Sequence, residues 1–99
     1  MARLKNNFDI DGEVIYIGLP DRFTDKYSRR LLVIKTYKGK YQTEIPVDFV
    51  NNDMSKMDGL ALGDEVIINF QVGGRGKVGE DGNKKWYPHI EGKSVQKLN

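Results

Sequence analysis

The chain has 99 residues, of which 38% are hydrophobic and 30% are charged, as is typical of one globular domain with a modest core. We treat residues 1–99 as a single domain and expect 1–7 and 96–99 to be flexible ends. The absence of cysteine excludes disulfides and thiolate metal sites. No apolar run is long enough for a signal peptide or a membrane span, which predicts a cytoplasmic protein without a membrane partner.

The charge is unevenly distributed along the chain, although the net charge is only +2. Residues 21–40 contain seven positive and two negative side chains, and residues 75–99 contain six positive and three negative ones. Residues 41–74 reverse the balance, with one positive and six negative side chains. A fold that brings the two basic segments together would therefore have one basic and one acidic face.

Five runs rich in β-branched and aromatic residues predict strands. They span residues 8–19, 29–37, 41–49, 63–72 and 84–95. The alternation in the first run slips near Gly12, which predicts a glycine bulge in a long, bent strand. Gly39 supplies the positive φ of a tight hairpin between the second and third runs. Pro46 places the third strand at an edge, and Pro88 is expected to interrupt the fifth.

One helix is expected, over "NNDMSKMDGL". An Asn or Asp would cap its start, Val50, Met54 and Met57 would share one face, and Gly59 would end it. The order of elements predicts an all-β, five-stranded oligonucleotide/oligosaccharide-binding (OB) barrel with a short helix between strands 3 and 4. A small barrel of the SH3 type, the main rival, would lack this helix.

Strand order, "GDEVIINF" before a glycine-rich basic hairpin, and the final "KWY" strand resemble those of OB-fold single-stranded DNA-binding proteins of the compact kind found in bacteriophages and bacteria. The resemblance covers roughly residues 8–96. It implies that aromatic side chains and the loops joining strands one to two and four to five hold a DNA strand across the barrel face. Those loops are "PDRFTDKYSRR" and "GGRGKVGEDGNKK", where positive charge collects.

Single-strand binders combine cations for phosphates with flat side chains on which bases stack. The candidate phosphate contacts are Arg22, Lys26, Arg29, Arg30, Arg75, Lys77, Lys84 and Lys85. The candidate stacking residues are Phe23, Tyr27, Tyr37, Tyr41, Trp86 and Tyr87. The glycine-rich loop that carries Arg75 is interpreted as a flexible basic flap.

Several of these aromatic residues also have a purely structural interpretation. Trp86 and Tyr87 are adjacent on a strand, so they point to opposite faces and one is expected in the core. If Trp86 faces inward with Pro88, Tyr87 and His89 face the groove; a bulge at Pro88 would reverse this. Tyr37 and Tyr41 flank a hairpin turn, where they either bind or pack against each other as a cross-strand pair.

Enzymatic interpretations fit the sequence less well. Gly74, Gly76 and Gly79 match G-x-G-x-x-G, but "EDGNKKWYP" follows instead of the helix that a dinucleotide site needs. Val78 after Gly76-Lys77 rules out a P-loop. A single histidine excludes a histidine-based metal cluster. We therefore expect no catalytic activity, no cofactor and no metal.

The sequence thus predicts a non-enzymatic protein that binds single-stranded DNA with little sequence preference. It would protect exposed strands in replication, recombination or repair, and we expect these strands to belong to a phage genome. It would then work in the host cytoplasm. Two alternatives stay open. One is an OB-fold protein-interaction module of a replication or virion assembly, with replication proteins as partners or a homodimer formed at the edge of the third strand. The other is a single-stranded RNA binder.

Overall fold

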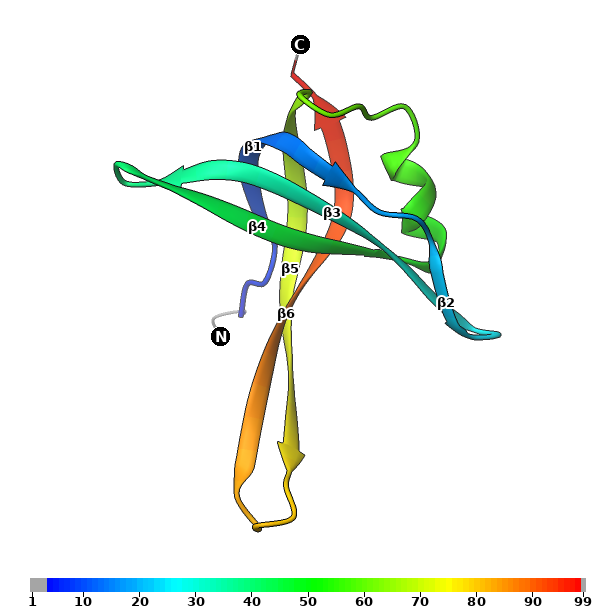
Figure 1. Ribbon diagram of the computed structural model, residues 1–99, viewed down its shortest axis with the longest axis vertical. Helices are drawn as coiled ribbons and strands as arrows, with labels where there is room; N and C mark the ends of the chain where they lie inside the picture. Colours follow the sequence, from blue (N-terminus) through cyan, green and yellow to red (C-terminus); the bar gives the residue numbers. More distant parts are fainter. Residues whose placement is uncertain (1–3, 99) are drawn as a thin grey trace.

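The computed structural model describes residues 4–98 and shows a five-stranded barrel with two projecting hairpins and a long arm (Figure 1). Its elements are β1 (Phe8–Ile17), β2 (Asp21–Thr24), β3 (Tyr27–Lys38), β4 (Tyr41–Val50), η1 (Asn51–Met57), β5 (Glu65–Val78) and β6 (Lys84–Lys97). Neighbouring strands follow the order β1-β5-β6-β4-β3, and β3 pairs again with β1, which closes the barrel. The predicted five-stranded OB barrel is confirmed.

The short strand β2, which we did not predict, pairs only with the start of β3. It shifts the numbering, so the helix lies between β4 and β5, the third and fourth strands of the barrel itself. Of the segments expected to be flexible ends, residues 96 and 97 continue β6, and the Leu98 N–H donates to the Glu65 carbonyl at 2.8 Å. Residues 1–3 and 99 lie outside the described residues.

The first strand bends because it serves two neighbours. It pairs with β5 from Phe8 to Glu13 and with β3 from Glu13 to Ile17. The register slips between Val14 and Tyr16, so the predicted bulge at Gly12 is wrong by a few residues. Gly12 has a different role: a Cβ there would lie 2.9 Å from the Lys35 carbonyl oxygen, so its absence lets β1 and β3 approach closely.

The core occupies the inside of the barrel, and η1 covers one end of it. Eight fully buried side chains form it: Val14, Leu32, Ile34, Val47, Phe49, Met57, Val66 and Ile68. Met57 comes from η1, and Met54 packs against the same cluster, as their spacing predicted. η1 is a 3₁₀ helix that starts without a side-chain cap. Asn51, expected as a cap, has φ 52° and instead accepts a hydrogen bond from the Ser28 N–H at 2.9 Å.

Pro46 has the edge position that the sequence predicted, whereas Pro88 does not break its strand as expected. At Pro46, β4 pairs with β3 along one edge only. Along its other edge, β4 pairs with β6 only at Asp48, so the predicted edge position of Pro46 is confirmed. Pro88 does not interrupt β6, which runs unbroken from Lys84 to Lys97. Over this stretch β6 pairs with β5 alone, and a strand with one open side can accommodate a proline.

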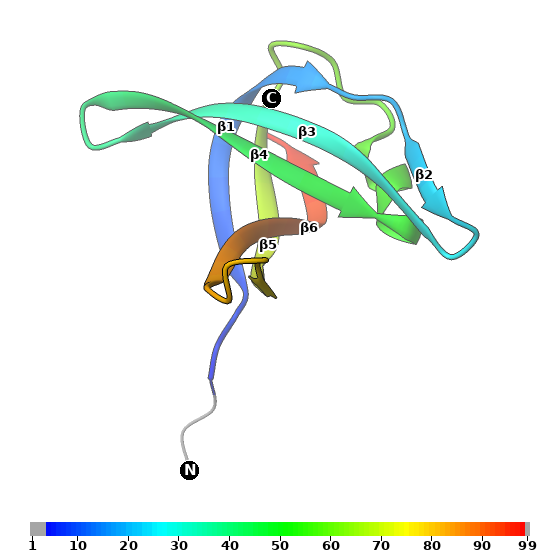
Figure 2. The same ribbon diagram turned by 60° about the horizontal axis from the view of Figure 1, so that its bottom comes forward.

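The glycine-rich segment is a β-ribbon rather than a flexible loop. Residues 73–78 of β5 pair with 84–89 of β6 in a regular antiparallel register, and we call this ribbon with its turn 79–83 the arm. The turn is closed by a bond from the Gly79 N–H to the Asn83 carbonyl and by Asn83 bonding to Asp81. The arm projects away from the barrel, and the β2–β3 and β3–β4 hairpins point in other directions (Figure 2). Among residues 4–98, no helix is long and apolar enough to span a membrane.

Gly92 of β6 sets the packing of the core, which leads to a stability prediction. A Cβ at this position would lie 2.6 and 2.7 Å from the Cε2 and Cε1 atoms of the buried Phe49 ring. We expect Gly92→Ala to lower the free energy of unfolding by about 1–3 kcal/mol, because Phe49 has to move. Urea unfolding measures this. Gly73→Ala is the matched strand control, since its Cβ would come no closer than 3.8 Å to any atom; equal effects of the two changes would contradict the packing argument.

Candidate nucleic-acid interface

The two basic segments of the sequence meet across a cleft. The β2–β3 hairpin forms one wall and the arm forms the other, and the space between them has a volume of about 600 Å³. The residues that line this cleft are Tyr27, Arg29, Gly73, Gly74, Arg75, Lys77, Tyr87, Pro88 and His89. Five of the predicted binding residues therefore come together in one place, although they lie up to sixty positions apart in the chain.

Strand alternation divides the arm into two faces. Arg75 is opposite Tyr87, and Lys77 is opposite Lys85, so these four side chains share the face that lines the cleft, which we call the front face. Beyond the cleft, a hollow of about 450 Å³ continues along this face past Lys77, Lys85 and Tyr87 to the acidic turn. Of the two adjacent aromatics it is therefore Tyr87 that faces the groove, and His89 joins it.

The opposite wall is an aromatic cluster capped by an arginine. Phe23 lies at an irregularity in the β2–β3 pairing, and its ring is 5.8 Å from that of Tyr27. The Arg29 guanidinium lies 4.6 Å from the centre of the Phe23 ring, in a cation–π contact. Arg29 and Tyr27 thus line the cleft opposite Arg75 and Tyr87, and Phe23 packs against both of them.

Acidic groups lie at the base of the cleft. Asp48 Oδ2 is 3.3 Å from His89 Nδ1 and 3.9 Å from an Arg29 nitrogen. Glu91 is 3.8 Å from His89 Nε2, and its hydrogen bond with Lys93 at 2.9 Å raises the pKa of Lys93. Lys93 thus compensates the charge of Glu91, whereas Asp48 lies near both Arg29 and His89.

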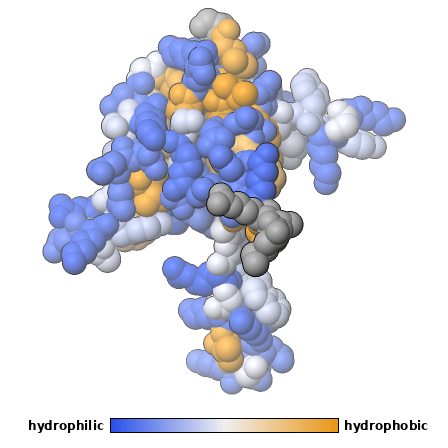
Figure 3. Space-filling view, turned by 180° about the vertical axis from the view of Figure 1, so that it is seen from behind, coloured by the Kyte–Doolittle hydropathy of each residue, from blue (hydrophilic) through white to orange (hydrophobic). Residues whose placement is uncertain are grey.

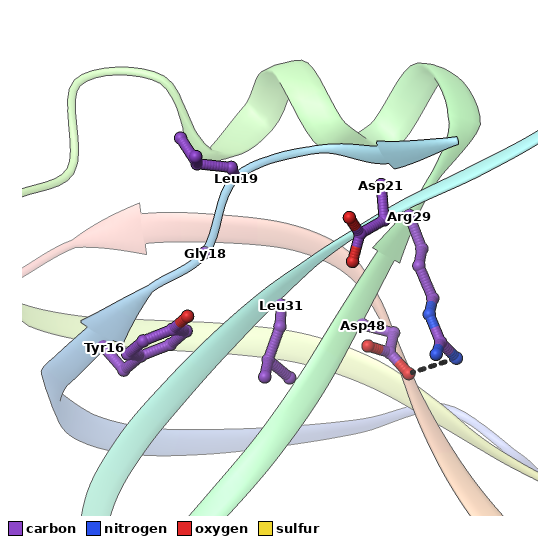
Figure 4. A pocket seen from close by; sticks show the side chains of 7 residues that line it. All are labelled: Tyr16, Gly18, Leu19, Asp21, Arg29, Leu31 and Asp48. Carbon is purple, nitrogen blue, oxygen red and sulfur yellow. Dashed lines mark ion pairs between the residues drawn. The ribbon is translucent and has the colours of Figure 1, made fainter. Parts of the chain in front are cut away.

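A second hollow, of about 430 Å³, lies next to the cleft (Figure 4). Arg29 lines both the cleft and this hollow. Tyr16 and Leu31 lie on its floor, and the Arg29–Asp48 ion pair closes one end. Sequence reasoning missed Tyr16 and Leu31. The bulge after Val14 turns Tyr16 outward opposite Val33, and no local pattern marks a bulge at that place.

Two predicted arginines do not belong to the cleft. The Arg30 side chain is only 19% exposed, and it donates to the Gly18 carbonyl at 2.8 Å and to Asp58 at 3.3 Å. Arg22 is opposite Ser28, on the other face of the hairpin from Arg29, and forms an ion pair with Asp25 at 3.1 Å. Lys26 lies at the hairpin turn next to Tyr27.

Four predicted aromatic or basic residues lie elsewhere. Tyr37 and Tyr41 are at the tip of the β3–β4 hairpin, where Tyr37 is opposite Gln42 and Tyr41 is opposite Lys38. The two tyrosines therefore lie on opposite faces, and the cross-strand pair is not formed. Trp86 and Lys84 lie on the face of the arm away from the cleft. The expectation that one of Trp86 and Tyr87 is in the core is wrong, since both are exposed on the arm, which extends past the core.

The cations of the arm differ from most others in having no carboxylate partner. Within residues 4–98, none of Arg75, Lys77, Lys84 and Lys85 forms an ion pair, whereas Arg22, Arg30, Lys35 and Lys97 each do. An unpaired cation on an exposed ribbon is free to bind an external anion.

Comparison with models of known protein families identifies the family of this chain. A family model described as a domain of unknown function, DUF3127, matches residues 9–96. The chain belongs to this family. No curated protein matches the sequence of this DUF3127 member significantly.

Solved structures show the same fold at low sequence identity. The mitochondrial single-stranded DNA-binding protein Rim1 from S. cerevisiae superposes with a TM-score of 0.70 at 12% identity, over 96% of this chain and 97% of that one. The SSB domain of a protein from Synechococcus sp. gives a TM-score of 0.67 at 13% identity, over 96% and 98% of the two chains. The DUF3127 chain thus has the OB fold of these proteins, as its sequence predicted, while the narrower bacteriophage type stays a prediction.

Proposed function

We propose that this protein binds single-stranded DNA with little sequence preference and catalyses no reaction. The observation that carries the proposal is the cleft itself, in which Arg29 and Tyr27 on the β2–β3 hairpin face Arg75, Lys77 and Tyr87 on the arm. Cations and exposed rings on both walls are what a single strand needs for its phosphates and bases. The OB fold shared with single-stranded DNA-binding proteins supports the same function.

The strand would run from the arm across Arg29 into the hollow over Tyr16 and Leu31. Arg75, Lys77 and Arg29 would neutralise phosphates, and Tyr87 and Tyr27 would stack bases. Asp48 is negatively charged and would not bind a phosphate; it would instead form an ion pair with the Arg29 guanidinium, which lies at the junction of the two hollows. None of these groups reads a base edge in a fixed geometry, so binding would depend little on sequence. In the cell, such binding would protect exposed strands during replication, recombination or repair.

The test is a fluorescence-anisotropy titration of a labelled oligothymidine at several salt concentrations. If Arg29, Arg75 and Lys77 each neutralise one phosphate, log K should fall against log salt with a slope of about −2, at about −0.7 per phosphate. A duplex of equal length should bind more weakly, because its bases cannot stack on Tyr87. Absence of binding at low salt would contradict the proposal.

An RNA oligonucleotide of the same length separates the remaining alternatives. Tighter binding of RNA than of DNA would make the protein an RNA binder, since stacking alone does not distinguish the two sugars. Failure to bind either strand would favour a protein-interaction module, for which a salt slope of this size is not required.

A further inference from the structure

The Trp86 side chain belongs neither to the hydrophobic core nor to the lining of the cleft. It lies on the back of the arm, opposite Gly76, and its side chain is 70% exposed. Gly76 allows this position, because a Cβ there would lie 3.2 Å from Trp86 Nε1 and would collide with the Lys84 side chain. The Lys84 ammonium lies 5.5 Å from the centre of the indole ring. The back face therefore carries an exposed ring with a cation beside it.

The four consecutive residues Lys84 to Tyr87 repeat one pattern on both faces of the arm. Alternation along β6 places Lys85 and Tyr87 on the front face and Lys84 and Trp86 on the back face. On each face, β6 thus contributes one unpaired lysine and one exposed aromatic ring, about 7 Å apart along the strand. The back face therefore has a cation and an exposed ring, as the cleft does. The front and back faces meet at the edge of β6 that pairs with no other strand.

We propose that a DNA strand leaving the cleft passes around the β6 edge of the arm and stacks a base on Trp86. This inference rests on the proposed function and adds a second contact site to it. The strand crosses at the edge rather than at the tip, because Glu80 and Asp81 occupy the turn and would repel phosphates. Within residues 4–98, the arm projects away from the barrel and its outer part stands clear of it (Figures 1 and 3).

Charge favours a nucleic acid over a second copy of the chain as the occupant. Residues 72–90 contain four positive side chains against two negative ones, and both negative ones lie in the turn. Two arms packed back to back would bring Lys84 of each copy to the same interface, and such like-charge contacts are unfavourable. A polyanion with flat bases matches both the lysine and the ring.

The length of the bound strand provides the test. The path from front to back covers the thickness of a β-ribbon with its side chains, on the order of 10 Å. At the rise of about 3.4 Å per nucleotide of a stacked strand, this corresponds to about three nucleotides beyond those that fill the cleft. Trp86 is the only tryptophan in the chain, so intrinsic tryptophan emission reports on the back face alone.

The experiment titrates the protein with oligothymidines from about 4 to about 20 nucleotides, a range that spans the site sizes of OB folds. Anisotropy of a label on the DNA measures binding, and tryptophan emission measures stacking on Trp86. We expect the shortest oligonucleotides that bind to leave the emission unchanged. Quenching should begin at a length about three nucleotides greater.

The double variant Trp86→Phe, Tyr87→Trp is the matched control, because it moves the single fluorophore to the front face and keeps a ring at both positions. In this variant, quenching should begin with the shortest oligonucleotides that bind. Binding at every length without quenching of Trp86 would overturn the proposal, as would full quenching by the shortest strand. Absence of any anisotropy change would overturn the proposed function, and this inference with it.

Discussion

Replacing Tyr87 by alanine will weaken the binding of single-stranded DNA about 5- to 150-fold. Tyr87 is opposite Arg75 on the front face of the arm and lines the cleft with a half-exposed ring. One stacked base is worth roughly 1–3 kcal/mol, and the loss of its platform converts to that range of affinity. Anisotropy titrations of the wild type and of Tyr87→Ala at one salt concentration measure the ratio of dissociation constants.

Two variants separate stacking from other causes of weaker binding. Tyr87→Phe keeps the ring and should bind within about twofold of the wild type. Tyr41→Ala removes an even more exposed ring at the tip of the β3–β4 hairpin and should leave the affinity unchanged. If Tyr41→Ala weakened binding as much as Tyr87→Ala, the strand would follow the β3–β4 hairpin instead of the cleft. The free energy of unfolding should change little in all three, because the replaced rings are exposed.

The barrel was predictable from sequence because its strands carry the information locally. Alternation of apolar residues marked the five barrel strands, Gly39 marked a hairpin turn by its positive φ of 62°, and Pro46 marked an unpaired edge. Each of these signals acts within a few residues. The helix was found in the same way, since Met54 and Met57 face the core at helical spacing.

The misplaced elements depend on contacts that no local pattern encodes. Gly12 looked like a bulge, but it is a close crossing of β1 over β3, visible only once the barrel is closed. The segment 73–78 looked like a flexible loop because of its glycines, yet it is held as a strand by its partner 84–89. β2 is four residues long and pairs at one edge, so its pattern is too short to indicate a strand.

The candidate site was predictable in chemistry and less so in geometry. Alternation showed that Trp86 and Tyr87 point to opposite faces but left open which one faces the groove, and the strand register places Tyr87 there together with His89. The sequence could not show that Arg30 turns toward Asp58 while its neighbour Arg29 faces the cleft. Nor could it show that Asp48, from the acidic middle of the chain, lies between Arg29 and His89. The predicted separation of the molecule into one basic and one acidic face is therefore wrong at the base of the cleft, where Asp48 lies near Arg29.

Arg75→Ala will weaken binding about tenfold at low salt and will reduce the salt dependence. Arg75 has no ion-pair partner within the described residues, so its charge is available to a phosphate. A hydrogen-bonded contact to a charged group is worth about 1.5 kcal/mol or more, which gives the tenfold loss. Removing one neutralised phosphate should also make the slope of log K against log salt shallower by about 0.7.

Lys40→Ala is the matched control for Arg75→Ala, because it removes the same formal charge from an exposed turn at the far end of β3 and β4. Its slope should stay that of the wild type if phosphates lie along the cleft. A shallower slope in both variants would mean that overall charge, and not the cleft, attracts the strand. Arg75→Lys refines the result: a wild-type slope with reduced affinity would show that the planar guanidinium adds contacts that a single ammonium cannot make.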